Sequence, residues 1–60
     1  MYTIITLVMF PNGTRYYTET ETSLKSTFDY IVGAVFDSKF DKATWLIDSK
    51  GKLIDSYIKE

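Results

Sequence analysis

The 60-residue sequence contains no cysteine and no histidine. Without cysteine the chain can form no disulfide, and it offers no thiolate nucleophile or thiolate metal ligand. Without histidine it lacks the commonest general base and a preferred zinc ligand as well. The two absences argue against an ordinary hydrolase or metalloenzyme. We therefore expect a protein that is not an enzyme, with no catalytic residue, no bound metal and no cofactor.

The chain also lacks an excess of basic residues and a long apolar run. Seven basic and eight acidic residues give a formal net charge of −1, so little counterion release is gained on a polyphosphate backbone and a nucleic-acid partner is disfavoured. The apolar start stops at Pro11, which is too short for a membrane span, and it has no basic region typical of a signal peptide. We expect a cytoplasmic protein with no membrane partner.

The longest helical pattern runs from Thr22 to Lys39. Thr22 or Ser23 is suited to cap its start, and we expect its end near residue 38. Gly33 would lie on the exposed side, either because something approaches it closely or because the fold tolerates it there. The apolar stripe consists of Leu24, Phe28, Ile31 and Val35, widened by Val32 and Phe36.

Two β-hairpins are expected to flank this helix. Tyr2–Phe10 and Thr14–Thr20 surround a Pro-Asn-Gly turn, and Ala43–Asp48 and Lys52–Ile58 surround a Ser-Lys-Gly turn. Glycine in the last turn position favours a type I turn with a G1 bulge in both hairpins. The expected cross-strand pairs are Val8 with Tyr16, Thr6 with Thr18, Leu46 with Ile54, and Thr44 with Ser56.

The predicted fold is α+β, a single domain over residues 1–60. It has a four-stranded antiparallel sheet of two hairpins with one amphipathic helix, in the order ββαββ. One helix can cover only one face of such a sheet. The positions assigned inward are Ile4, Val8, Phe10, Tyr16, Leu46, Ile54 and Ile58. The positions assigned outward are Ile5, Leu7, Met9, Tyr17, Trp45, Ile47, Leu53 and Tyr57.

An outward face this apolar indicates a contact surface for another protein. The predicted partner-binding residues are Trp45, Tyr57, Tyr17 and Leu7, with Arg15, Glu19 and Asp55 as a polar rim. If the register were slipped by one residue, Trp45 would lie in the core instead. An apolar face would remain uncovered in either register.

One resemblance rests on size, on the order of elements, and on the final segment Ala43-Thr44-Trp45-Leu46-Ile47-Asp48-Ser49-Lys50-Gly51-Lys52-Leu53. In these features the chain resembles the Dmd antitoxins of T-even phages and, more broadly, small phage-encoded inhibitors of host enzymes. The resemblance implies a phage protein that acts in the host cytoplasm and blocks a host ribonuclease toxin by filling its active cleft as an acidic plug. It assigns a role to no individual residue.

The function predicted from these features is that of a small protein-binding module, an inhibitor or antitoxin directed against a host nuclease or defence protein. The alternatives are a homodimer that self-associates through its sheet, a small-ligand binder, and a single-strand nucleic-acid binder that stacks bases on Tyr16, Tyr17 and Tyr30.

Overall fold

The computed structural model describes residues 1–37 and 39–59, and within the helix it describes side chains as far as Ala34. The elements follow the chain as β1 (Tyr2–Met9), β2 (Arg15–Thr22), α1 (Ser26–Asp37), β3 (Asp41–Ile47) and β4 (Leu53–Ile58). All four strands are antiparallel to their neighbours in one sheet of order β2-β1-β3-β4. The predicted α+β class and ββαββ order are confirmed.

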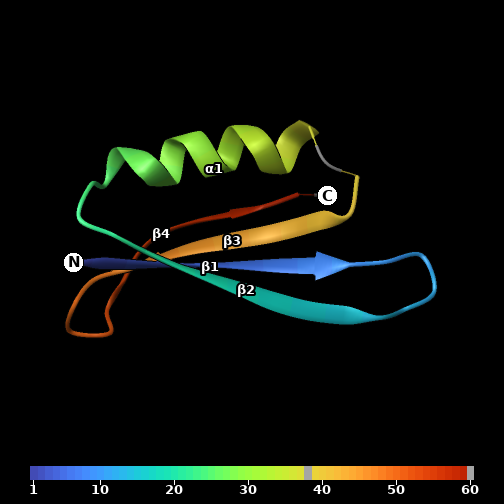
Figure 1. Cartoon of the computed structure of the whole chain (residues 1–60), viewed down its shortest axis with the longest axis horizontal. Coiled ribbons are helices and arrows are strands. Elements are labelled where there is room, and N and C mark those ends of the chain that lie inside the picture. The colour runs from blue at the N-terminus through green and yellow to red at the C-terminus, as the bar shows by residue number, and fades with distance from the viewer. Residues whose placement is uncertain (38, 60) are drawn as a thin grey trace.

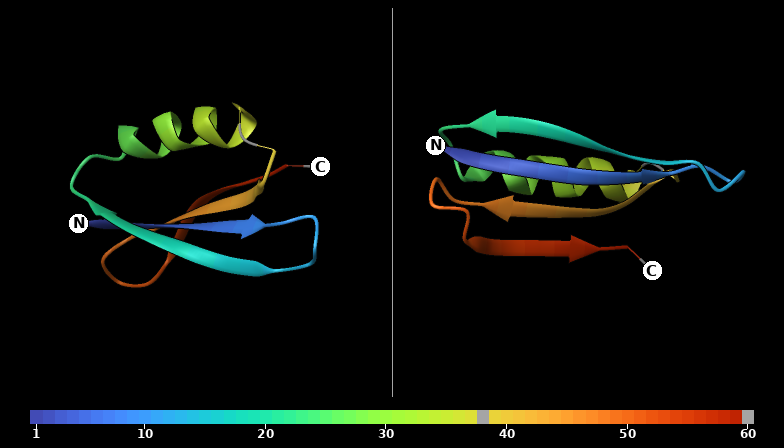
Figure 2. Two further views of the ribbon diagram at one scale, coloured as in Figure 1. Left: turned by 45° about the vertical axis from the view of Figure 1, so that its right-hand side comes forward. Right: turned by 90° about the horizontal axis from the view of Figure 1, so that it is seen from below.

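The molecule has two layers. In Figure 1 helix α1 lies along one side of the sheet, and no element of the described chain lies against the opposite side. The right-hand view of Figure 2 looks onto that opposite side, with the strands in front and α1 behind them. We call the side toward α1 the inner face and the opposite side the outer face.

The first hairpin pairs as the sequence predicts. Val8 lies opposite Tyr16 and Thr6 opposite Thr18, without interruption from Tyr2 to Met9. Gly13 takes a φ of 90°, a left-handed conformation that glycine adopts without a steric penalty. The turn is closed by the Phe10 amide, which donates to the Thr14 carbonyl at 2.8 Å. Alternation along β1 therefore assigns its faces correctly.

The second hairpin has the same turn but a different register. Gly51 takes a φ of 82°, and the Asp48 amide donates to the Lys52 carbonyl at 2.9 Å. The Asp48 carboxylate also accepts bonds from the Lys50 and Lys52 amides, both at 2.9 Å. Beyond the turn the register shifts, so that Leu46 lies opposite Asp55 and Thr44 opposite Tyr57. The predicted pairs Leu46–Ile54 and Thr44–Ser56 are wrong, because Ile54 is an extra residue with no direct partner.

Helix α1 begins later than the sequence suggested. The Thr22 hydroxyl accepts a bond from the Leu24 amide at 3.1 Å and lies 3.0 Å from the Thr27 hydroxyl, so it stabilises the turn before the helix. Leu24 is 62% exposed and lies outside the helix, contrary to its place in the predicted stripe. The side chains of Val35 and Phe36, also assigned to that stripe, lie outside the described ones.

The core lies between α1 and the two central strands. Ile4 from β1, Phe28 from α1 and Leu46 from β3 are almost completely buried. Partly buried residues pack around them: Tyr2, Ile31, Val32 and Tyr57. Thr6 and Thr44 are buried beside this cluster, and their hydroxyl oxygens lie 3.1 Å apart, which satisfies both groups. The inner face thus forms a small, closed core.

Candidate protein-binding face

The outer face is apolar across its two central strands. Because cross-strand partners point to the same side of a sheet, the β1–β3 register places Ile5 beside Trp45 and Leu7 beside Ala43. The β3–β4 register adds Leu53 beside Ile47. Ile4 and Leu46 are buried under α1, so the residues adjacent to them in each strand, including Ile5, point away from α1. The apolar outer positions are Ile5, Leu7, Met9, Tyr17, Ala43, Trp45, Ile47, Leu53 and Ile58.

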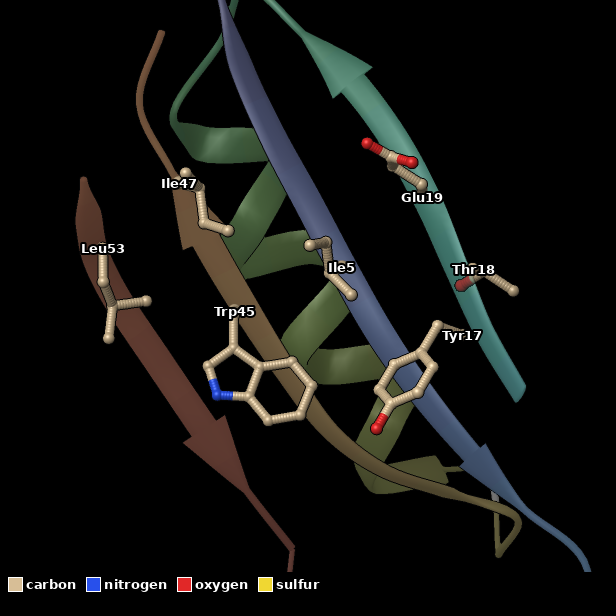
Figure 3. A pocket seen from close by; sticks show the side chains of 7 residues that line it. All are labelled: Ile5, Tyr17, Thr18, Glu19, Trp45, Ile47 and Leu53. Atoms are coloured by element: carbon tan, nitrogen blue, oxygen red, sulfur yellow. The ribbon is translucent and has the colours of Figure 1, made fainter. Parts of the chain in front are cut away.

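Trp45 and Tyr17 frame a shallow depression in this face. Their ring centroids lie 6.5 Å apart at an interplanar angle of 41°. Tyr17 comes from β2 and is 64% exposed, whereas Trp45 comes from β3 and is partly buried among its neighbours. Figure 3 shows both rings on the side of the sheet away from α1, with Ile5 between their strands. The depression has a volume of about 440 Å³ and is lined by Ile5, Tyr17, Thr18, Glu19, Trp45, Ile47 and Leu53.

On the outer face, β2 contributes three charged residues. Arg15 pairs with Met9 at one end of the strand, and Glu19 and Glu21 pair with Ile5 and Thr3 toward the other end. All three charged residues are exposed. The sheet therefore presents an apolar centre with a base at one end of its β2 edge and two acids at the other.

The predicted partner-binding residues fall into two groups. The first group shares the outer face, because its members are cross-strand partners or alternate residues of neighbouring strands. It consists of Trp45, Tyr17, Leu7, Arg15 and Glu19. Tyr57 and Asp55 do not. Tyr57 packs against the core cluster, and Asp55 lies opposite Leu46, so both lie on the inner side of β4. The prediction that they face outward is wrong.

The cause is the single extra residue in β4. With Ile54 inserted, every later side chain of the strand changes face relative to the uninterrupted register. Ile58 consequently lies opposite Ala43 on the outer face and is 64% exposed, where an inward position had been predicted. Ile54, also assigned inward, is 38% exposed. The shift places small Ser56 opposite Trp45 and large Tyr57 against the core.

Several outer-face residues are absent from the predicted binding site. Ile5, Ile47 and Leu53, which were assigned outward, line the depression between the two aromatic rings. Glu21 lies two residues beyond Glu19 on the same side of β2. Alternation within each strand identified their face. Their proximity to Trp45 depends on β1 lying next to β3, and no local feature of the sequence specifies that contact.

The three tyrosines considered for base stacking are dispersed. Tyr16 lies on the inner side of β2 beside Phe10, at a centroid distance of 5.4 Å. Tyr17 lies on the outer face, and Tyr30 projects from α1 with 81% of its surface exposed. They form no continuous platform for successive bases. A Cβ added to the nearby Gly33 would meet no atom within 4 Å, so nothing in the described chain approaches that glycine closely.

Within residues 1–37 and 39–59 there is no group of three acidic, histidine or cysteine residues placed to hold a metal ion. No helix in that same part of the chain has the length and apolar character needed to cross a bilayer. No family model, no curated protein and no solved structure matches this chain.

Proposed function

We propose that this chain is a small non-enzymatic domain that binds another polypeptide through its outer face. The observation that carries the proposal is an apolar sheet face that no element of the described chain covers. On a soluble protein, a contiguous apolar surface of this kind is stabilised by contact with a partner. The absence of histidine and cysteine from the sequence supports binding in preference to catalysis.

Binding energy would come mainly from the aromatic and aliphatic side chains around the depression. Trp45 and Tyr17 are of the residue types that dominate interface energetics, and each is supported by aliphatic neighbours. Glu19 and Glu21 would act at the margin, where charge influences the choice of partner more than the affinity.

We assign the domain to the inhibitor class, as a phage-type inhibitor or antitoxin that blocks a host nuclease or defence protein. Two features support this class: the resemblance to small phage inhibitors, and the acidic end of β2 beside an apolar anchor. Nucleases carry basic residues where they hold phosphates, so a surface with Glu19 and Glu21 next to apolar side chains complements such a site.

The test compares two matched variants, Tyr17→Glu on the outer face and Tyr30→Glu on the helix. Both replace an exposed tyrosine by the same acid, so the variants have identical composition and charge. The wild-type protein and each variant are immobilised, and the proteins that each retains from a bacterial lysate are compared. Retained ribonucleases are then assayed for RNA cleavage with and without each variant.

The proposal predicts a bound polypeptide, whether foreign or a second copy of the chain, that is retained by the wild type and by Tyr30→Glu but lost from Tyr17→Glu. If the bound polypeptide is a nuclease, its inhibition should follow the same order. A set of bound polypeptides that is identical for both variants would overturn the proposal.

A further inference from the structure

We infer that, while no foreign protein is bound, the occupant of the outer face is a second copy of this chain, docked face to face about a two-fold axis that runs across the strands. This inference rests on the proposed function, because it concerns the same binding surface, which a nuclease could reach only after the two copies separate. Its support is the arrangement of charge and side-chain size on the outer face, which is complementary to itself.

The axis is defined by one row of cross-strand neighbours. Thr6 of β1 lies opposite both Thr18 of β2 and Thr44 of β3, and Thr44 lies opposite Tyr57 of β4. The side chains of this row point to the inner face, but its backbone marks a line across the outer face that separates the two ends of every strand. A two-fold axis placed along this line, between the two copies, sets each strand over the same strand of the other copy. The two strands of such a pair run in opposite directions.

The exchange brings opposite charges together on β2. Arg15 and Glu21 lie equally far from Thr18, on opposite sides of it, so Arg15 of each copy is placed over Glu21 of the other. Within one chain these two residues are separated by about 20 Å of extended strand, too far to pair. The dimer therefore creates two ion pairs that the single copy cannot make.

The same exchange matches apolar positions on the central strands. On β1 it places Ile5 over Leu7, and on β3 it places the position of Trp45 over that of Ala43. Ala43 has the smallest side chain on the outer face and is only 4% exposed, so it lies below its larger neighbours. The largest outer side chain is thus placed opposite the smallest.

The other face-to-face arrangement, with the axis along the strands, is less complementary. It would place β2 of one copy over β4 of the other, whose outer residues are Leu53, Ser56 and Ile58. Arg15, Glu19 and Glu21 would then lie over uncharged side chains. Only the axis across the strands gives Arg15 and Glu21 partners of opposite charge.

The available area is sufficient for such a contact. Cα positions extend over 34 × 19 × 16 Å, and Figure 2 shows that the sheet occupies most of the longest dimension. Strands of 6 to 8 residues at a spacing of about 4.8 Å give roughly 400–500 Å² per copy. The total of about 800–1,000 Å² is at the lower limit for a specific interface and suits a weak, micromolar contact.

The decisive experiment is a charge exchange read out by analytical ultracentrifugation over a range of protein concentrations. The wild type should dimerise at micromolar concentration. Arg15→Glu and Glu21→Arg should each weaken dimerisation by on the order of tenfold, because each replaces two ion pairs by two like-charged contacts. The double variant Arg15→Glu/Glu21→Arg should restore the wild-type dissociation constant.

Two controls separate failure of this inference from failure of the proposed function. Tyr30→Glu should leave the dimer unchanged, whereas Tyr17→Glu should abolish it, because residue 17 would lie over Glu19 of the other copy. The self-docked arrangement would be overturned if the wild type stays monomeric, or if dimerisation of the double variant is weakened by as much as the two single substitutions together. If a foreign protein is nevertheless retained by the wild type and lost from Tyr17→Glu, the outer face remains the binding surface of the proposed function. A dimer that Tyr17→Glu does not affect would contradict both.

Discussion

The two faces of the sheet use the same strands in opposite ways. On the inner face Ile4 and Leu46 are buried at 1% and 0% exposure under α1, and the two buried threonines satisfy each other. On the outer face Tyr17 and Leu53 remain 64% and 55% exposed. Alternate residues of one strand are therefore buried on the inner face and exposed on the outer face, so adjacent substitutions should differ greatly in their effect on stability, and only the outward ones should affect the proposed binding.

The largest effect is expected from neighbouring residues of β3. Leu46→Ala removes a completely buried side chain and should cost about 2–5 kcal/mol of unfolding free energy, enough to unfold much of a domain this small. Ile47→Ala lies on the outer face and should cost about 1 kcal/mol. Thermal unfolding followed by circular dichroism at two protein concentrations would measure both, and equal losses would contradict the division into faces.

Two tyrosines sharpen the same comparison. Tyr57→Ala removes a ring that packs against the core, so it should cost about 1–3 kcal/mol of stability and leave outer-face binding intact in the folded fraction. Tyr17→Ala should change stability by less than about 0.5 kcal/mol but weaken binding. Chemical denaturation and a binding titration on each variant would separate the two roles. If Tyr57→Ala keeps its stability but loses binding, Tyr57 contacts the partner and not the core.

The buried threonine pair gives a smaller effect with a distinctive pattern. Thr6→Val or Thr44→Val alone leaves the other hydroxyl buried without its partner, so each should cost about 1–2 kcal/mol. The double variant removes both hydroxyls and should recover to within about 0.5 kcal/mol of the wild type. Denaturant unfolding of all four proteins forms a double-mutant cycle, and simply additive losses would show that the two hydroxyls are not coupled.

The smallest effect is a gain. Gly33→Ala in α1 adds a Cβ that meets no atom within 4 Å, so it should stabilise the helix by about 0.5–1 kcal/mol. Outer-face binding should not change, because α1 lies on the other side of the sheet. Gly51→Ala is the matched control and should destabilise by about 1 kcal/mol, since its φ of 82° is strained for alanine. Thermal melting would show the opposite signs directly, and a loss of stability in Gly33→Ala would indicate that this position needs glycine.

The two hairpins show where sequence reasoning succeeds and where it fails. Turn chemistry at Gly13 and Gly51 was predicted in both, and both glycines have the expected positive φ. The first hairpin then continues without interruption, so strict alternation assigned Tyr17 and Leu7 correctly. The second contains an extra residue at Ile54, and alternation therefore assigned Tyr57 and Asp55 to the wrong face. A bulge of this kind has no local signature, because Ile54 is as suited to a regular strand as its neighbours are.

The sequence by itself determined the order of elements, both turns and the excess of apolar side chains over what one helix can cover, because these depend on periodicity and on residues close in the chain. Only the tertiary structure decided that β1 lies beside β3, that Ile54 interrupts β4, and hence which side chains surround Trp45. Those features depend on contacts between residues far apart in the sequence. The bulge turns the ring of Tyr57 toward the core, where burial of its apolar surface is favourable.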